Sequence, residues 1–167
     1  SIMLAGPLLA RFGEVTMSHP GGCIIGKRPI DLFLSGLRAM GAEIFDHGES
    51  FTLKAKKLKG AKIVMPKIAV TATESLMMTA CLAEGKTTII NAAMEPEIPA
   101  LADYLNKCGA KITGAGTPQI VIEEVEKLSG GKYELIPDRI ETGSFVILGL
   151  ATNSKIKITN CNPKHLE

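Results

Sequence analysis

The sequence predicts an α/β protein built from a duplicated unit of about 70 residues, with helices inside and sheets outside. The first observation behind this prediction is a repeat: residues 36–44 return as residues 104–112 with matching leucine, glycine, alanine and isoleucine positions. The second is that residues 76–82 and 145–151 are apolar on nearly all sides, as helices wrapped inside a structure are. We therefore expect buried central helices covered by sheets.

Each repeat is predicted to run from a strand through a loop to a helix, a glycine-ended turn, a two-strand hairpin, a further strand and a second helix. Residues 59–66 and 130–137 match each other and supply the further strand. Short β-rich segments open the repeats at residues 13–18, 86–91 and 155–160.

The first helix of each repeat is predicted from apolar residues spaced i, i+3, i+4 and i+7, which form one face of a helix. A glycine follows each of these helices where a helix-ending residue is expected. The apolar positions are Ile30, Phe33, Leu34 and Leu37 in one repeat and Ile98, Leu101, Ala102 and Leu105 in the other, and the glycines are Gly41 and Gly109.

Composition excludes several classes of protein. The chain has 167 residues, 46% of them hydrophobic and 22% charged, with a net charge of +2, so it is neither a disordered tail nor a strongly basic nucleic-acid binder. No apolar run approaches the ~20 residues that span a bilayer. The four cysteines and three histidines lack the spacing of a disulfide scaffold or a metal site. We expect a cytoplasmic protein without metal or cofactor that binds neither nucleic acid nor membrane.

The most informative motif is the segment of residues 20–31, Pro-Gly-Gly-Cys-Ile-Ile-Gly-Lys-Arg-Pro-Ile-Asp. It sets Cys23 among glycines and close to two cations, which lower the pKa of a thiol. Arg28 offers a planar fork of donors for phosphate or carboxylate, and Pro29 suits the first turn of a helix. The motif predicts a reactive thiol beside an anion site, although a lone cysteine is more often a buried apolar residue.

This motif resembles that of the UDP-N-acetylglucosamine 1-carboxyvinyltransferases, a family of enolpyruvyl transferases in peptidoglycan synthesis, and the resemblance runs the whole length of the chain. The shikimate-pathway relatives of this family lack the Gly-Gly-Cys loop. Further matching runs lie at residues 6–13, 59–65, 82–85, 95–97 and 137–143.

The resemblance implies a fold of repeated βαβαββ units, an inside-out α/β barrel in two domains. It implies transfer of the enolpyruvyl group from phosphoenolpyruvate to the 3-hydroxyl of UDP-N-acetylglucosamine, with release of phosphate. Cys23 would be the general acid and the target of fosfomycin, and Arg28 would hold the phosphate of phosphoenolpyruvate. The residues implied to line the nucleotide-sugar site are Arg28, Pro29, Ile30, Asp31, Leu32, Lys67, Ile68, Ala69 and Val70.

Two positions depart from the family pattern. Ala69 stands where the family usually has serine, and Thr71 where it usually has glycine, so a hydroxyl donor is missing and a β-branched residue is added. Lys67 keeps its match, although a lysine in an exposed turn is by itself commonly only solvated. Affinity for the nucleotide is the property these departures affect.

We expect the chain to be an internal piece of a longer enzyme. Residues 1–137 would form most of the domain with the catalytic loop, and residues 138–167 the beginning of a second, truncated domain. The general base and a second phosphate-binding arginine of the family fall outside residues 1–167, so we expect the chain alone to be inactive and able to self-associate through exposed apolar surface. The implied cellular roles are cell wall biogenesis, cell shape, cell cycle and cell division.

A different class of function stays open. The chain could be a non-catalytic sugar-nucleotide-binding or structural module that keeps the repeat fold, as the departures at Ala69 and Thr71 permit. A redox or metal protein that uses the cysteines is a weaker alternative, because the cysteines are widely spaced.

Overall fold

The computed structural model describes residues 2–19 and 30–167 and divides into two compact units, Ser1–Gly131 (unit 1) and Lys132–Glu167 (unit 2). Within the described ranges, no helix is long and apolar enough to cross a membrane. The domain boundary expected after residue 137 stays a prediction. Cys23, Arg28 and Pro29 lie outside the described residues.

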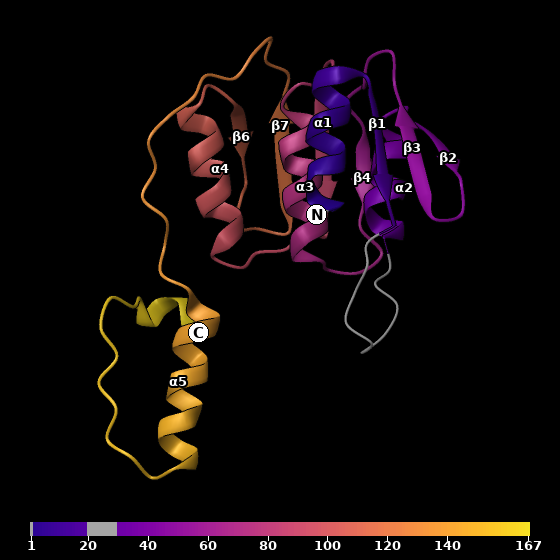
Figure 1. The fold of residues 1–167 in the computed structure, drawn as a ribbon. Helices are drawn as coiled ribbons and strands as arrows, with labels where there is room; N and C mark the ends of the chain where they lie inside the picture. The colour runs from indigo at the N-terminus through magenta and orange to yellow at the C-terminus, as the bar shows by residue number, and fades with distance from the viewer. Residues whose placement is uncertain (1, 20–29) are drawn as a thin grey trace. The chain divides into compact units, whose positions relative to one another are not determined.

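Unit 1 holds four α-helices and seven strands among its described residues, and unit 2 holds one α-helix and a short 3-10 helix (Figure 1). In chain order the elements are η1 (Ile2–Leu4), α1 (Ala5–Phe12), β1 (Glu14–Ser18), α2 (Asp31–Ala39), β2 (Glu43–Asp46), β3 (Ser50–Lys54), β4 (Lys62–Val64), α3 (Val70–Ala80), β5 (Lys86–Ile90), α4 (Glu97–Lys107), β6 (Lys111–Thr113), β7 (Gln119–Glu123), α5 (Arg139–Ala151) and η2 (Pro163–Leu166).

The two sheets of unit 1 repeat one topology, which confirms the predicted duplication. The first sheet has the order β1-β3-β2, and the second contains the same antiparallel arrangement as β5-β7-β6. A fourth strand, β4, joins the second sheet beside β5 and parallel to it. The last strand of the first repeat therefore completes the sheet of the second.

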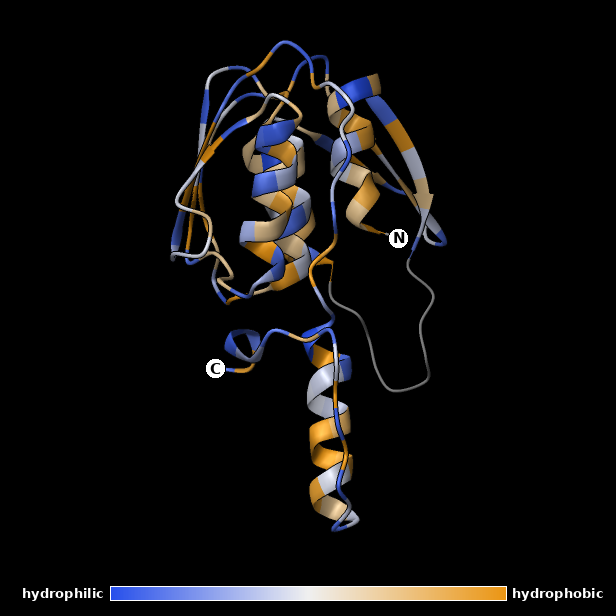
Figure 2. Cartoon of the chain, turned by 90° about the vertical axis from the view of Figure 1, so that its left-hand side faces the viewer, coloured by the Kyte–Doolittle hydropathy of each residue, from blue (hydrophilic) through white to orange (hydrophobic). Residues whose placement is uncertain are grey.

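Helices lie between the sheets, as predicted. Figure 2 shows α1, α3 and α4 between the sheet that contains β4 to β7 on one side and β1 on the other. Both periodic helices form, as α2 and α4, and each ends before a glycine of positive φ, +92° at Gly41 and +102° at Gly109. Glycine adopts this left-handed conformation without the clash that a Cβ atom causes, which is why the helices stop there.

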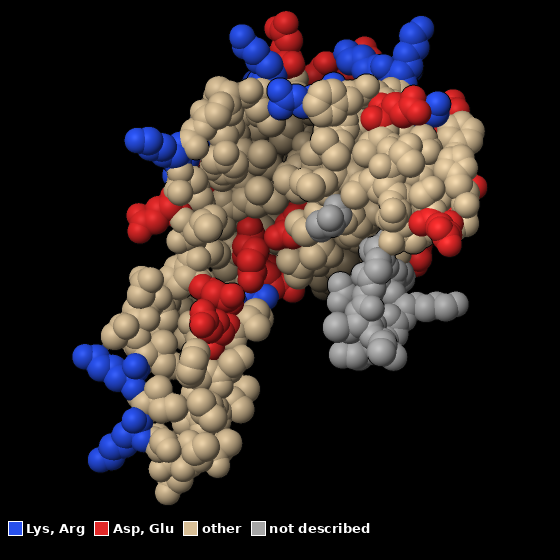
Figure 3. All heavy atoms as spheres, viewed as in Figure 1, with Lys and Arg blue, Asp and Glu red and all other residues tan. Residues whose placement is uncertain are grey.

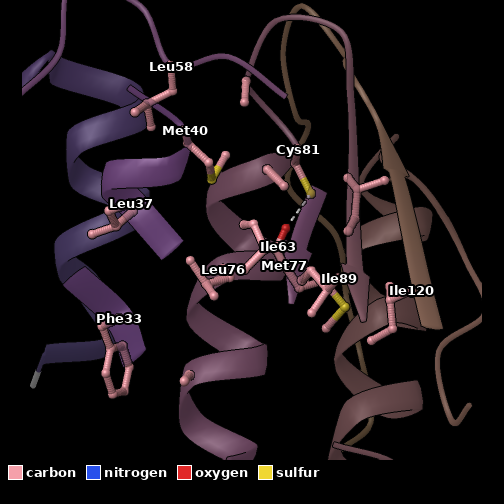
Figure 4. Close-up of a cluster of buried hydrophobic side chains, with 14 of the residues drawn as sticks. Phe33, Leu37, Met40, Leu58, Ile63, Leu76, Met77, Cys81, Ile89 and Ile120 are labelled. Atoms are coloured by element: carbon pink, nitrogen blue, oxygen red, sulfur yellow. Dashed lines mark hydrogen bonds between the residues drawn. The ribbon is translucent and has the colours of Figure 1, made fainter. Parts of the chain in front are cut away.

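Helix α3 is the centre of the core. Its Leu76 and Met77 are fully buried, and their neighbours come from α2, β4, β5 and β7 (Figure 4). Met77 fills the core, since its flexible side chain suits an irregular space among aliphatic groups. The prediction of a helix wrapped inside the structure is confirmed for residues 76–80.

Two glycines allow the neighbouring helices to approach α3 closely. A Cβ atom on Gly6 of α1 would collide with the Thr79 hydroxyl, and one on Gly36 of α2 would lie 2.5 Å from a methyl group of Leu76. Both separations are shorter than a van der Waals contact. The packing of α1 and α2 on α3 therefore depends on the absence of these side chains.

The prediction that residues 145–151 form a buried helix is wrong as to burial. The helix forms, as α5, but Ile147 is 67% exposed and Leu150 is 78% exposed. Thr142 is the one residue of α5 that is buried. Unit 2, at 36 residues (132–167), is too small to cover an apolar helix on all sides.

The strands predicted in unit 2 are also not formed. Residues 132–137 and 155–160 have no regular secondary structure, whereas the matching β4 and β5 pair with each other. A strand needs partners for its backbone N–H and C=O groups. Among the described residues of unit 2 there is no strand to supply them.

Substitution of Gly6 tests the close helix packing. Gly6→Ala is expected to lower the free energy of unfolding by about 1–3 kcal/mol, because the added methyl group overpacks the contact with Thr79. Urea unfolding followed by circular dichroism measures the change. Gly130→Ala is the control, since nothing lies within 4 Å of its Cβ position, and its effect should stay within about 0.5 kcal/mol. Equal effects of the two substitutions would contradict the packing account.

Candidate functional site

The two substrate-binding segments predicted in the described residues lie at the starts of neighbouring helices. Residues 30–32 begin α2, and residues 67–70 lead into α3. Helices α2 and α3 contact each other, and their N-terminal ends lie at the end of unit 1 where β1 finishes (Figure 1). The fold therefore brings together two segments that are far apart in the sequence.

The segment between β4 and α3, residues 65–69, is held at both ends by polar side chains. Asn91 donates from Nδ2 to the Met65 carbonyl at 2.9 Å. Buried Thr73 donates from Oγ1 to the Ala69 carbonyl at 2.9 Å and accepts the Ala93 N–H at 3.1 Å. Lys67 and Ile68 are exposed between these two anchors. The backbone around Lys67 is thus fixed while its side chain is free to meet a ligand.

The N-terminus of α3 is chemically suited to an anion. Its N-cap residue is Ala69, which makes no side-chain cap, and the first turn contains no acidic residue. The first N–H groups of a helix lack internal partners and carry the positive end of the helix dipole. Exposed Lys67 adds a charge two residues before. In contrast, α2 has Asp31 in its first turn, which already occupies the favourable position for negative charge.

The predicted site residues differ in their exposure. Leu32 is buried in the core, where its side chain packs against other apolar residues, and its predicted place in the substrate site stays a prediction. Ile30 is half-buried against the core at the N-cap position of α2. Ala69 and Val70 are half-buried at the start of α3, and Thr71 is exposed one residue later. The two anchors, Asn91 and Thr73, were missed by sequence reasoning.

Carboxylates gather near the same end of unit 1. Burial raises the pKa of Glu74 on α3, and the nearby negative charges of Glu97 and Glu95 raise it further. Glu97 lies in the first turn of α4, a position where the helix dipole favours negative charge. Figure 3 shows acidic side chains near this end of unit 1. Within the described ranges, no group of three potential ligands could hold a metal ion.

The described cysteines of unit 1 are unreactive in character. Cys81 is fully buried on α3, its thiol donates to the Met77 carbonyl at 3.3 Å, and burial raises its pKa to about 11 (Figure 4). Cys108 is also buried. A thiol reacts as the thiolate, so Cys81 is not a candidate nucleophile at neutral pH, and the burial of Cys108 shields its sulfur from reagents.

The histidines near β1, His19 and His47, contact neighbouring side chains at the surface. His19 Nε2 lies 3.3 Å from Asp46 Oδ1, and its ring is tilted against Phe51 at 5.3 Å between centroids. The Gly48 N–H and His19 lower the pKa of Asp46. His47 Nε2 lies 3.0 Å from the Thr52 hydroxyl. The His19 contacts tie the end of β1 to the β2–β3 hairpin, and the His47 contact lies within that hairpin.

Comparison with known proteins identifies the family. A family model described as EPSP synthase (3-phosphoshikimate 1-carboxyvinyltransferase) matches residues 1–167. The chain belongs to the EPSP synthase family. This membership agrees with the enolpyruvyl transferase resemblance predicted from the motif at residues 20–31.

The curated relatives within the EPSP synthase family carry a more specific name. The chain is 50% identical over 167 residues to the UDP-N-acetylglucosamine 1-carboxyvinyltransferase of Coxiella burnetii strain RSA 493, which covers 99% of the chain and 38% of that relative. It is 54% identical over 172 residues to the protein of the same name from Campylobacter hominis, covering 40% of it. The predicted resemblance is confirmed, and the chain spans about two fifths of the length of these relatives.

Two solved structures share the fold. The enolpyruvyl transferase NikO from Streptomyces tendae aligns with a TM-score of 0.72 at 22% identity, over 87% of this chain and 35% of its own. EPSP synthase from Acinetobacter baumannii aligns with a TM-score of 0.68 at 25% identity, over 88% of this chain and 33% of its own. The predicted fold class, mixed α/β with the enolpyruvyl transferase arrangement, is confirmed.

Two threonines test whether the anchor of residues 65–69 is structural. Thr73→Val should cost about 1–3 kcal/mol of unfolding free energy, because it leaves the buried Ala93 N–H without an acceptor. Thr87 is equally buried, but its hydroxyl has no hydrogen-bond partner among the described residues. Thr87→Val should therefore be neutral or stabilising by up to about 1 kcal/mol. Thermal and urea unfolding measure both, and a greater loss in Thr87→Val than in Thr73→Val would refute the assignment.

The raised pKa of Glu74 predicts a pH dependence. A carboxyl group whose pKa is raised on folding binds protons more tightly in the folded state, so stability falls as pH rises above its ordinary pKa of 4.5. Glu74→Gln should raise the melting temperature at pH 7 and have little effect at pH 4. The exposed Glu134→Gln variant of unit 2 is the control and should change little at either pH. A Glu74→Gln effect that is equal at both pH values would exclude the carboxylate repulsion.

Proposed function

We propose that this chain carries part of the substrate site of a UDP-N-acetylglucosamine 1-carboxyvinyltransferase. The reaction is transfer of the enolpyruvyl group from phosphoenolpyruvate to the 3-hydroxyl of UDP-N-acetylglucosamine, with release of phosphate. The observation that carries the proposal is the identity of about one half to proteins of that name over 99% of the chain. Support comes from the neighbouring helix starts, where both described substrate segments lie.

The proposed role of residues 67–70 is to bind the diphosphate of the nucleotide sugar. An anion at the start of α3 would meet N–H groups that no side chain caps, together with the ammonium group of Lys67. The anchors at Thr73 and Asn91 support this role, since a fixed backbone loses little entropy on binding. Ile30 and Asp31 are proposed to contact the same substrate from the start of α2.

Cys23 and Arg28 are proposed to act on phosphoenolpyruvate. The sugar 3-oxygen bonds to carbon 2 as its hydroxyl proton passes to a general base outside these 167 residues, and the Cys23 thiol delivers a proton to the methylene carbon, which gives a tetrahedral ketal. The carbon–oxygen bond to phosphate then breaks, and the new methyl group loses a proton to restore the double bond. Arg28 stabilises the phosphate charge through bidentate hydrogen bonds. Cys23 is the proposed reactive thiol because it lies in the glycine-rich motif beside two cations, whereas Cys81 and Cys108 are buried.

The remaining parts of the proposal concern the whole enzyme and the cell. The general base and a second phosphate-binding arginine would come from sequence beyond these 167 residues, and residue 138 would begin a second domain. No metal or cofactor is needed for the reaction as written. A cytoplasmic location and roles in cell wall biogenesis, cell shape, cell cycle and cell division are proposed on the same basis. The exposed apolar face of α5 supports self-association of the chain by itself.

A second candidate function is favoured by the residues at the start of α3. Ala69 supplies no hydroxyl to a phosphate oxygen, and Thr71 is exposed where the ligand would approach. A binding or structural module without catalysis would tolerate both. In that case, Ala69→Ser with Thr71→Gly should tighten binding of UDP-N-acetylglucosamine, as measured by calorimetry.

Reaction with fosfomycin tests the proposed reactive thiol. The chain incubated with fosfomycin should gain the mass of one adduct, located at Cys23 by peptide mapping, because the electrophile needs an accessible thiolate. Cys23→Ser should gain none. Phosphoenolpyruvate and UDP-N-acetylglucosamine together should release no phosphate with the chain alone, since the base is absent.

Two results would contradict the proposal. Adducts at Cys108 or Cys161 with none at Cys23 would remove the thiol from the mechanism. An unmodified Cys23 in a folded chain that still binds UDP-N-acetylglucosamine would favour the non-catalytic module instead.

A further inference from the structure

The edge of the second sheet carries a side chain that imitates a neighbouring strand. Strand β6 is the last strand in the order β4-β5-β7-β6, so one of its sides has no strand partner. On that side Asn106, in the last turn of α4, makes two hydrogen bonds to the main chain of Ile112. Its Oδ1 accepts the Ile112 N–H at 2.8 Å, and its Nδ2 donates to the Ile112 carbonyl at 2.9 Å.

The geometry explains why this pair of bonds closes the edge. In an antiparallel pair the N–H and C=O of one residue point together toward the partner strand or together away from it. Those of Ile112 reach α4, so they point away from β7. The donor and acceptor that Asn106 engages are the groups an added strand would use, and exposed edge groups are a template for pairing with another chain.

The first repeat offers a matched comparison. Its edge strand β2 corresponds to β6, with Ile44 in the place of Ile112 and Arg38 in the place of Asn106. A guanidinium group only donates, so Arg38 cannot reproduce both bonds. Among the described residues, no side chain is hydrogen-bonded to the main chain of Ile44. Within the part of the chain that the structure describes, the pair of hydrogen bonds from a side-chain amide to the edge strand is therefore particular to the second repeat.

The charges on the two edge strands differ in a way that agrees with this difference in hydrogen bonding. Strand β2 carries two carboxylates, Glu43 and Asp46, so pairing this edge with its copy would bring four negative charges together, and charged side chains on an edge strand oppose such pairing. In a β6 edge paired about Ile112, Lys111 would face Thr113 and no like charges would meet. Strand β2 is protected by its charge, whereas β6 needs another device.

We propose that Asn106 is a guard that prevents the β6 edges of two copies of this chain from pairing about Ile112. The side chain satisfies the outward N–H and C=O of Ile112 and stands where the second strand would lie. Removing the amide opens the edge to a second copy.

The exchange rate of the Ile112 amide proton reports directly on its hydrogen bond to Asn106. In Asn106→Ala it should exchange with solvent at least about tenfold faster than in the unchanged chain at low protein concentration, as measured by NMR. At high concentration the protection should return, and sedimentation should show an increase in dimer. Asn106→Gln, which keeps the amide but displaces it by one carbon, is a second opening variant in case the alanine variant does not fold.

Arg38→Ala on α2 is the matched control, since Arg38 holds the position of Asn106 in the first repeat, next to the edge strand β2. It should leave both the Ile112 exchange rate and the sedimentation pattern unchanged, and any association through α5 is common to all variants. Fast Ile112 exchange in the Asn106 variants at every concentration, without an increase in dimer, would overturn the proposal. Asn106 would then only connect α4 to β6. Slow exchange at every concentration without added dimer would show that Asn106 does not close the edge.

Discussion

The close approach of α1 and α2 to α3 is the constraint on which the rest of unit 1 depends. Gly6 and Gly36 allow the two helices to lie against Thr79 and Leu76, since a Cβ atom at either glycine would collide with α3. The same helix carries the anchor Thr73 near its start. Packing at one part of α3 thus fixes the position of the candidate anion site at its N-terminus.

The candidate site combines a segment fixed by hydrogen bonds with helix N–H groups that favour a negative charge. Thr73 and Asn91 fix residues 65–69, while no side chain caps the N–H groups at the start of α3. Near the same end, Glu74 is made harder to ionise by burial and by its acidic neighbours. The anion-binding groups at the start of α3 therefore lie near a carboxyl group whose pKa is raised.

Local signals in the sequence were sufficient for most of the fold of unit 1. The periodic residues of α2 and α4 and the glycines that end them depend only on neighbours along the chain, so they were predictable. Strands at residues 132–137 and 155–160 were not formed because pairing depends on partners elsewhere. The exposure of α5 could not be predicted from its sequence, because an apolar helix does not indicate which element packs against it. Thr73 and Asn91 act across the fold, and a lone polar residue within an apolar pattern was the only signal for either.

The placement of β4 in the second sheet gives the two repeats a shared structural element. Residues 62–64 belong to the first repeat by sequence but hydrogen-bond to β5 of the second, and the segment that follows them leads into the α3 N-terminus. Neither repeat has a complete architecture without the other, so the duplication did not yield two autonomous modules. The candidate ligand surface consequently depends on the pairing of β4 with β5, and it forms only when both repeats have folded together.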